Sequence, residues 1–477
     1  MTTVMRVLFR RFVVLLIPFL LAVLMMPLGT DIARAQPAKD NWSTPMAQKL
    51  GVKLEKTFDS SGPDAWDPKK HPLVFITSEG PGYGGLLSGV KLPGVAIFDA
   101  NSRQAVASQQ YDVLSWGWKN VFEPHGLGVS GDGKWLYLPT GEGSFGTNDM
   151  GRLLIINART LKVDKVLRLQ SNAHHAKALR RSDGKQLVLV ESFNEGHQPA
   201  FILDPANDNK VVGGWGNEEL GGHNGSYLNF ASPDGKEIFV GVGGGFAPPA
   251  SAFGKEESWV ARIDTMTWKN KGMITIPDGN IVWTAFSADD KYAYFSGAHL
   301  SRVFKYDRTA DKIVGYAQAG VQGPYGIHLD WADKFIYTVG KGESSHNRGR
   351  VLGKIDASRM GKPGGVFPAD QFTTDCIRGD HATLHPEPDA NEMWITCNSS
   401  FEVVVFDLDQ SKVAARIPMP HGGSTHSGAF VKYSGWNGEV VSDQNGLQGS
   451  ALATKRRLLA SQAPKAPKNG LQPPAVH

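Results

Sequence analysis

The sequence has very little cysteine, and this scarcity excludes several kinds of redox cofactor. Only Cys376 and Cys397 occur among the 477 residues, and no Cys-x-x-Cys-His motif is present. The chain therefore carries no covalent c-type haem, and it lacks a cysteine-rich module for a binuclear electron-transfer copper. Any redox chemistry must send its electrons to another protein. The two cysteines are most simply read as one disulfide with Cα atoms within about 7 Å, with metal ligation as the weaker alternative.

The sequence also lacks a strong charge imbalance and long helical patterns. The net charge is only +4, and no basic stripe with interleaved aromatic residues appears. This argues against nucleic acid as a partner.

A short pattern recurs along the chain and predicts the fold. In PHGLGVSGDGKWLYLPTGEG at 124–143, a histidine and a short strand precede a tight turn and a second alternating strand. Related copies are SDGKQLVLV from Ser182, SPDGKEIFV from Ser232, SADDKYAYF from Ser287, DWADKFIYT from Asp330 and PEPDANEMWIT from Pro386. A period of roughly 45 to 55 residues made of strands is typical of a β-propeller with four-stranded blades. With a degenerate unit near 425–443, we expect an all-β, seven-bladed β-propeller.

Two details of this fold are also predicted. Residues 71–77 and 95–99 should close the ring by completing the blade that the C-terminal end leaves unfinished. The turn aspartates should occupy equivalent places in their blades; they are Asp132, Asp183, Asp234, Asp289 and Asp333.

The N-terminal residues predict export. Arg6, Arg10 and Arg11 precede an apolar run at 12–28, and Ala33-Arg34-Ala35 offers small residues for cleavage. The secretory and twin-arginine routes both fit, and an uncleaved membrane anchor is the alternative. We expect a signal peptide at 1–35, a polar leader at 36–70, the propeller at 71–450 and a flexible tail at 451–477. The mature protein is expected in the periplasm.

Histidines gather where the innermost strand of a blade is expected to begin. Innermost strands line the axis of a propeller, so such residues converge at one end of the channel. The candidate metal ligands, one from each histidine-bearing blade, are His125, His175, His223, His328, His381 and His426. Their neighbours His174, His385 and His421 could replace them or orient them. A single histidine at a strand entrance more often bonds a carbonyl, so the prediction depends on the whole set.

The register of these histidines is staggered. PHGLGVSGDGKW aligns with PYGIHLDWADKF from Pro324, which places Tyr325 opposite His125 and moves the histidine of this blade to His328. Such a stagger suits several metal ions at different depths. The fourth blade begins with Ile281-Val282-Trp283 and has no histidine, so one side of the site should be open or aromatic. An imidazole-rich set favours copper by the usual order of affinities.

These residues resemble a known family. An exported seven-bladed propeller with axial histidines is similar to nitrous oxide reductase and more closely to thiocyanate dehydrogenase, which has a trinuclear copper site. The C-terminal copper domain of the reductase is absent here. The resemblance implies a multinuclear copper site, oxidation of thiocyanate to cyanate and sulfur, and an external acceptor such as a soluble cytochrome c. It also implies an active-site lysine, for which Lys91 in GGLLSGVKLPG is the candidate, and acidic residues, for which Glu123 and Asp380 are the candidates.

Two other functions stay open at this point. The chain could be a non-catalytic exported propeller that serves as a binding module, because fold alone does not define function. It could also be another metal propeller that oxidises a small sulfur compound, similar to methanethiol oxidase. The sequence leaves a homodimer open as well.

Overall fold

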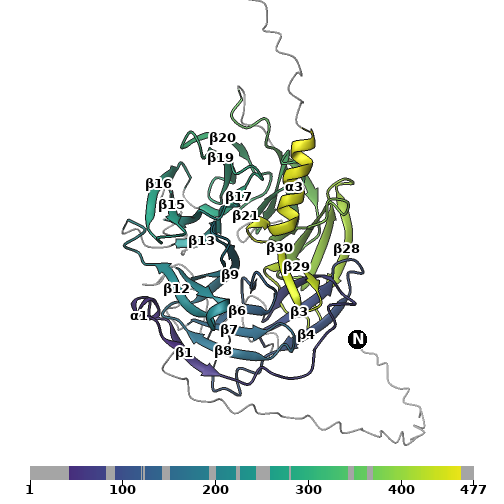
Figure 1. The fold of residues 1–477 in the computed structure, drawn as a ribbon. Coiled ribbons are helices and arrows are strands. Elements are labelled where there is room, and N and C mark those ends of the chain that lie inside the picture. The colour runs from purple at the N-terminus through teal and green to yellow at the C-terminus, as the bar shows by residue number, and fades with distance from the viewer. Residues whose placement is uncertain are drawn as a thin grey trace, which may run out of the picture. The chain divides into compact units, whose positions relative to one another are not determined.

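Strands dominate the structure. The computed structural model describes residues 42–81, 92–119, 121, 124–141, 151–192, 200–221, 226–242, 258–278, 281–341, 349–362 and 369–462. The described strands form seven antiparallel sheets around a ring, so the protein is the seven-bladed β-propeller that the repeat predicts (Figure 1). No helix among these residues is both long enough and apolar enough to cross a membrane.

Each blade runs from an inner strand at the channel to an outer strand at the rim. Blade 1 contains β5 (Gly128–Val129), β6 (Trp135–Gly141), β7 (Gly151–Asn157), β8 (Val163–Arg168) and, at its outer edge, β1 (Lys53–Thr57). Blade 2 contains β9 (Ala173–Arg180), β10 (Gln186–Ser192), β11 (Ala200–Asp204) and β12 (Lys210–Trp215), with the short 3-10 helix η3 (Pro205–Asn207) between the last two. Blade 3 contains β13 (Ser226–Ala231), β14 (Glu237–Val242), β15 (Ser258–Asp264) and β16 (Asn270–Ile276).

The remaining blades repeat this order. Blade 4 contains β17 (Ile281–Phe286), β18 (Tyr292–Gly297), β19 (Arg302–Asp307) and β20 (Lys312–Gln318). Blade 5 contains β21 (Pro324–Leu329), β22 (Phe335–Gly340), β23 (Val351–Asp356) and β24 (Asp370–Thr373). Blade 6 contains β25 (Gly379–Leu384), β26 (Glu392–Cys397), β27 (Glu402–Asp407) and β28 (Lys412–Pro418).

Blade 7 closes the ring with strands from both ends of the chain. β29 (Gly428–Ser434) pairs with β2 (Leu73–Glu79), which pairs with β3 (Gly94–Asp99) and then β4 (Ala105–Gln110). The predicted closure by residues 71–77 and 95–99 is confirmed. Aromatic side chains fill the space between this blade and blade 6, where the Phe75 and Phe430 rings each lie 5.2 Å from the ring of Trp394.

Burial decreases from the channel to the rim, as the layered packing of blades requires. Every residue of the inner strands β9, β13, β17, β21 and β25 is buried except Arg180. The outer strand β28 instead alternates between exposed positions and positions that are partly or fully buried. Strands that are covered on both faces read as continuous apolar runs, and half-covered strands alternate. The core therefore lies between neighbouring sheets, around the ring.

The turn that joins the first two strands of a blade uses the same chemistry in several blades. Ser130 Oγ accepts hydrogen bonds from the backbone of Lys134 and Trp135 at 3.1 and 3.0 Å, and it donates to Asp132 at 2.7 Å. Ser232 and Ser287 repeat this with Asp234 and Asp289. In five blades the residue just before the lysine of this turn has a positive φ. The angle is 71° at Gly133, 85° at Gly184, 67° at Gly235, 62° at Asp290 and 51° at Asp333.

This register corrects one of the predicted turn positions. Asp333 occupies the place of Gly133 in the left-handed region and is not equivalent to Asp132. In blade 5 the accepting side chain is Asp330, whose carboxylate accepts from the backbone of Lys334 and Phe335 at 2.8 and 3.0 Å, as Ser130 does in blade 1. Aspartate tolerates the left-handed conformation, so both roles can be filled by the same residue type.

The ends of the propeller differ from the expected boundaries. α1 (Pro45–Lys49) and β1 come from the predicted polar leader, and β1 adds to the sheet of blade 1 because its backbone pairs with β8. α3 (Gly449–Gln462) includes the first part of the predicted flexible tail. This helix is held because Lys455 bonds the carbonyl of Asp330 at 2.6 Å and Arg456 bonds the carbonyl of Ala288 at 2.6 Å.

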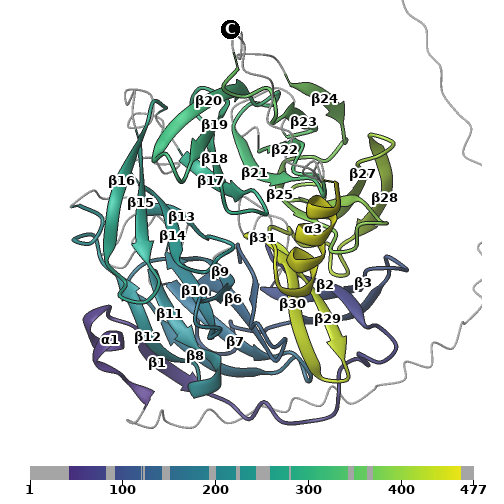
Figure 2. The same ribbon diagram turned by 45° about the horizontal axis from the view of Figure 1, so that its top comes forward.

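The C-terminal strands fill the channel. β30 (Asn437–Asp443) and β31 (Gly446–Leu447) follow β29, and the turn between them reaches the inner strands of blades 2 and 3. Asn445 donates to the carbonyl of Ala178 at 3.0 Å and accepts from the backbone of Ala231 at 3.1 Å, while Gln444 donates to Ser427 at 3.0 Å. α3 then covers the face that carries the turns of blades 4 and 5 (Figure 2).

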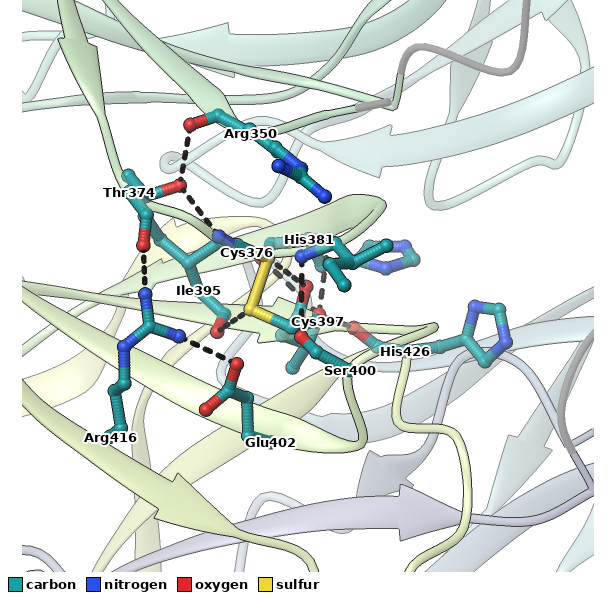
Figure 3. The surroundings of a disulfide bond; sticks show 12 residues. Arg350, Thr374, Cys376, His381, Ile395, Cys397, Ser400, Glu402, Arg416 and His426 are labelled. Atoms are coloured by element: carbon teal, nitrogen blue, oxygen red, sulfur yellow. Dashed lines mark hydrogen bonds and ion pairs between the residues drawn. A yellow bond between two sulfur atoms is a disulfide. The ribbon is translucent and has the colours of Figure 1, made fainter. Parts of the chain in front are cut away.

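The predicted disulfide is confirmed. Cys376 and Cys397 are bonded, with Cα atoms 5.3 Å apart. The bond joins the segment before β25 to the end of β26, beside the backbone of His381 and His426 (Figure 3). The residue next to it, Thr396, accepts from the His381 amide at 3.1 Å and donates to the carbonyl of His426. The disulfide thus fixes the strand ends of blade 6, where Thr396 bonds the backbone of two candidate ligands.

Replacing both cysteines by serine should lower the free energy of unfolding. The cysteines are 21 residues apart in sequence, and loop entropy of that length corresponds to about 3 kcal/mol. Urea unfolding of the oxidised wild type, the reduced wild type and the double serine variant measures the effect. Equal stability of the oxidised and reduced wild type would contradict the prediction.

Candidate metal centre

Five imidazole rings meet where the inner strands of blades 1, 2, 6 and 7 begin. The ring of His125 lies 3.8 Å from that of His426, 4.6 Å from that of His174 and 5.4 Å from that of His175. His175 in turn lies 4.9 Å from His381. All five side chains are buried, with at most 1% of each residue exposed. Histidines that are far apart in sequence therefore form one cluster at the end of the channel.

A β-bulge allows two consecutive histidines of blade 2 to face the cluster. In a regular strand, successive side chains point to opposite faces of the sheet. Here Glu191 pairs with His175 and Ser192 pairs with Ala173, so His174 is an extra residue in β9. Bulges of this kind redirect side chains and are common next to active sites. The bulge explains why both His174 and His175 contact His125.

The same irregularity places two residues of blade 6 in the site. Between Gly379 and Ala382 the strand β25 advances three residues, whereas its partner β26 advances two, from Cys397 to Ile395. The extra residue brings both Asp380 and His381 to the cluster. Register shifts at corresponding positions occur in β13, β17 and β21, so the bulge is a repeated property of the inner strands.

Gly126 permits close approach of blades 1 and 2. It forms a parallel bridge with His175, in which its amide donates to the carbonyl of His174 at 2.9 Å and its carbonyl accepts from the amide of Ala176 at 2.8 Å. A Cβ atom on Gly126 would lie 2.3 Å from Cγ of His175. A larger residue would push the imidazoles of His125 and His175 apart.

Asp380 contacts two histidines and a buried lysine. Its Oδ2 accepts a hydrogen bond from Nδ1 of His426 and lies 3.1 Å from Nδ1 of His381. Its Oδ1 lies 3.1 Å from Nζ of Lys341, which also stands 4.2 Å from the centre of the Tyr325 ring. The other ring nitrogen of His426 lies 2.6 Å from the Asn398 amide nitrogen. The candidate acidic residue Asp380 thus lies within the cluster.

A second buried lysine and carboxylate lie behind His174 and His175. Glu191 Oε2 accepts from Nζ of Lys177 at 3.2 Å and from the amide of Asn229 at 2.7 Å. Glu191 Oε1 lies 3.4 Å from Nδ1 of His175 and 3.8 Å from Nδ1 of His174. Each side of the cluster therefore has one carboxylate near two imidazoles, backed by one ammonium group.

Aromatic residues close the other sides. The ring of Tyr227 lies 5.1 Å from that of His174, and its hydroxyl is 2.8 Å from the hydroxyl of Tyr325. The rings of Tyr325 and Trp283 each lie 5.1 Å from that of His381. The aromatic side that the histidine-free fourth blade predicts is present.

The environment keeps four of these histidines neutral. Burial lowers the pKa of His125, His174 and His175 well below the ordinary value, and nearby positive groups lower it further. Burial also lowers the pKa of His381, to about 4, although Asp380 opposes this shift. Burial raises the pKa of Asp380, but Lys341 and the adjacent histidines outweigh it and leave the pKa well below its ordinary value. Neutral imidazole and ionised carboxylate are the forms that bind metals.

Several of these ring nitrogens are buried without hydrogen bonds. Neither ring nitrogen of His125 or of His175 has a hydrogen-bond partner among the described residues. A buried polar atom left unpaired costs about 1–3 kcal/mol. Two groups of three residues have ligand atoms within 4.8 Å of one another; they are His125, His174 and His175, and His125, Asp380 and His426. These groups could hold a metal ion.

Not every predicted site residue joins this cluster. Of the predicted ligands, His125, His175, His381 and His426 come together, and His174 joins them. Lys91, Glu123 and His223 lie outside the residues that the structure describes. His385 instead packs against Phe430, with ring centres 5.0 Å apart, and His421 is exposed.

His328 differs from the prediction. It lies three residues beyond Tyr325, or about 10 Å along an extended strand. Its ring packs 5.9 Å from that of Trp283, and its side chain lines a cavity of about 30 Å³ with Leu447 and Lys455. The alignment of Tyr325 with His125 correctly predicts which residue of blade 5 lies beside the cluster, because the Tyr325 ring packs against His381.

Sequence reasoning missed Lys177, Glu191 and Lys341. A charged residue within an apolar strand was the available signal for the first two, because AHHAKAL and LVLVES place them among buried positions. Charged residues are rarely fully buried unless they are paired. Lys341, directly after β22, gives no comparable signal.

The comparisons with known proteins support the fold alone. No protein-family model matches the sequence, and no curated protein matches it. A putative 6-phosphogluconolactonase from Bacteroides fragilis is similar in structure, with 13% identity, a TM-score of 0.51 and coverage of 75% of this chain and 98% of that chain. The periplasmic gluconolactonase of Pseudomonas aeruginosa shows 16% identity and a TM-score of 0.50, covering 75% and 99%. A functionally unknown protein from Desulfotomaculum acetoxidans shows 11% identity and a TM-score of 0.50, covering 74% and 98%.

Substituting Gly126 by alanine should destabilise the protein by about 1–3 kcal/mol, the usual cost of overpacking a filled core. The added methyl group would collide with the ring of His175, whose backbone is bonded to this segment. Gly216→Ala is the matched control, because the nearest atom to its added Cβ is the end of the Glu219 side chain at 3.3 Å. Thermal unfolding of both variants tests this, and equal effects would contradict it.

Proposed function

We propose that this protein is an exported, copper-dependent oxidoreductase whose metal centre is the histidine cluster. The observation that carries the proposal is the burial of the His125 and His175 ring nitrogens without hydrogen-bond partners among the described residues. Side chains that only stabilise a fold are normally hydrogen-bonded when buried. Ligation by a metal ion would satisfy these atoms.

Copper is the metal that the ligand chemistry supports best. The cluster offers five imidazoles, and the carboxylates of Asp380 and Glu191 lie next to them. Imidazole suits copper, zinc, iron and nickel, and divalent copper heads the usual order of affinities. Bound copper would accept electrons from a substrate and release them to an external acceptor such as a soluble cytochrome c.

The substrate that we propose is thiocyanate. Its conversion to cyanate and sulfur consumes one water and releases two protons and two electrons, so the site must hold a small anion and remove protons. Lys341 supplies a compact positive charge at the cluster, which is the role that the resemblance implies for Lys91. Asp380 and Glu191 are ionisable groups within reach of the site, and burial raises the pKa of Glu191 to about 7, against the opposing effect of Lys177. Such a group can accept a proton near neutral pH.

Export is consistent with the chemistry of the chain. A disulfide joins the only two cysteines, and such bonds persist in oxidising compartments. The N-terminal pattern of arginines and apolar residues adds to this. We therefore place the mature protein in the periplasm, where a soluble cytochrome could accept its electrons.

Metal analysis tests the proposed centre directly. The full chain should bind copper, and His175→Ala should weaken copper binding by more than the 10- to 100-fold that loss of a residue supporting a ligand typically costs. His421→Ala is the matched control, since this histidine is exposed and its ring does not belong to the cluster. Chelator competition followed by elemental analysis measures the affinities. If copper does not bind, or if both variants bind as the wild type does, the proposal is overturned and the binding-module reading is favoured.

Activity tests the substrate separately. The copper-loaded protein should reduce cytochrome c in the presence of thiocyanate, and Lys341→Met should raise KM for the anion because it removes the buried positive charge at the site. Steady-state assays that vary thiocyanate measure both parameters. Copper binding without thiocyanate-dependent reduction would reject thiocyanate and leave oxidation of another small sulfur compound as the function to test.

A further inference from the structure

The two carboxylate oxygens of Glu191 have different neighbours. Oε2 has a structural role, because it accepts hydrogen bonds from Nζ of Lys177 at 3.2 Å and from the backbone N–H of Asn229 at 2.7 Å. Oε1 has no hydrogen-bond partner among the described residues and lies 3.4 Å from Nδ1 of His175. The residue is fully buried. A carboxylate that only neutralised Lys177 would not need its second oxygen at the imidazoles.

Lys177 is held so that it fixes Glu191. Its Nζ donates to the carbonyl of Asn229 at 2.6 Å and lies 4.0 Å from the centre of the Phe230 ring. The backbone of Asn229 therefore contacts both members of the pair, since its N–H donates to Glu191 and its carbonyl accepts from Lys177. The ammonium cannot follow a movement of Glu191 without losing these contacts, which keeps the carboxylate oriented toward β9.

We propose that Glu191 is a positioning residue that favours the Nδ1–H tautomer of His175, so that its Nε2 atom is the metal ligand. Nδ1 of His174, at 3.8 Å from Oε1, lies beyond hydrogen-bond distance. A neutral imidazole has one N–H donor and one acceptor nitrogen, and a carboxylate can only accept. Nδ1 of His175, which faces Oε1 at 3.4 Å, can therefore become a hydrogen-bond partner of Glu191 only in the form that carries the proton. The opposite nitrogen is left with its lone pair on the side of the ring away from Glu191. Carboxylates commonly orient metal-binding histidines in this way.

Asp380 supports this assignment by repeating the arrangement across the cluster. Its Oδ2 contacts Nδ1 of both His381 and His426, while Lys341 holds Oδ1. The two carboxylates come from different elements, β10 and β25, and each is paired with a buried lysine. Two independent segments of the chain thus present an acceptor to Nδ1 atoms.

The inference rests on the proposed metal centre, but its test has a readout that needs no metal. The metal-free full chain, labelled with 15N-histidine, is examined by NMR, because imidazole nitrogen shifts distinguish the two tautomers. Spectra of His174→Gln and His175→Gln assign the signals. The wild type should show the Nδ1–H form for His175, and Glu191→Gln should shift this residue toward the Nε2–H form.

Copper affinity is the second readout. Titration of the same proteins with Cu(II) against a chelator should show a 10- to 100-fold loss for Glu191→Gln, as is typical for residues that orient a ligand. Because this variant leaves Lys177 unpaired, the double variant Lys177→Met with Glu191→Gln removes the whole pair with neutral side chains of similar size. It should show the same loss. Glu237→Gln is the matched control, since Glu237 is buried among Arg262, Lys271 and Arg308.

The outcomes separate this inference from the proposed function. Wild-type tautomers and copper affinity in both Glu191 variants would reduce Glu191 to a structural ion pair and overturn the inference. Nε2–H tautomers in the wild type would also overturn it, even if copper binds. A tautomer change without copper binding to the wild type would support the positioning role while the metal function fails.

Discussion

The constraint on which this structure depends is a set of buried ring nitrogens. Those of His125 and His175 have no hydrogen-bond partner among the described residues. Each such nitrogen costs free energy on folding, so the cluster forms only because the surrounding propeller compensates for it. The compensation is distributed. Strand pairing closes the ring at blade 7, apolar cores fill the space between blades, and the β30–β31 turn occupies the channel behind the histidines. The stability of the blades thus supports a site that is itself unfavourable.

The same constraint accounts for local features that the propeller does not otherwise need. The bulges in β9 and β25 turn neighbouring side chains toward one point, and Gly126 lets two blades approach without a Cβ between them. The disulfide and Thr396 connect the segments that carry His381 and His426. Ligands on bulged, cross-linked strand ends are held more rigidly than ligands on loops, which favours a preorganised site.

The sequence predicted what repeats and missed what occurs once or breaks the repeat. Serine and aspartate turns with a following glycine recur in several blades, so the blade count and the convergence of the histidines could be predicted. A bulge has no residue signature in β9, and strict alternation would have assigned only one of His174 and His175 to the channel. Tyr325 and His328 show the reverse case. The alignment correctly placed Tyr325 at the level of His125, but His328 was predicted as the ligand although it lies three residues farther along the strand. Lys341 and Glu191 reach the site from second strands, whose position relative to the cluster depends on the packing of whole blades.

The charges around the cluster bear on the class of ligand that it would accept. Lys177 with Glu191, and Lys341 with Asp380, form two neutral pairs when all four groups are ionised. The imidazoles of His125, His174, His175 and His381 add no charge, because burial lowers their pKa and keeps them unprotonated. Positive charge from metal ions at this point would therefore not be balanced by the residues that contact the histidines. In a water-excluded site, an unbalanced charge is expensive, and binding of an anion relieves it. A small anion next to the metal and Lys341 would balance the positive charge of the bound metal. This is the physical argument for the proposed anionic substrate, thiocyanate or a similar anion, over a neutral one.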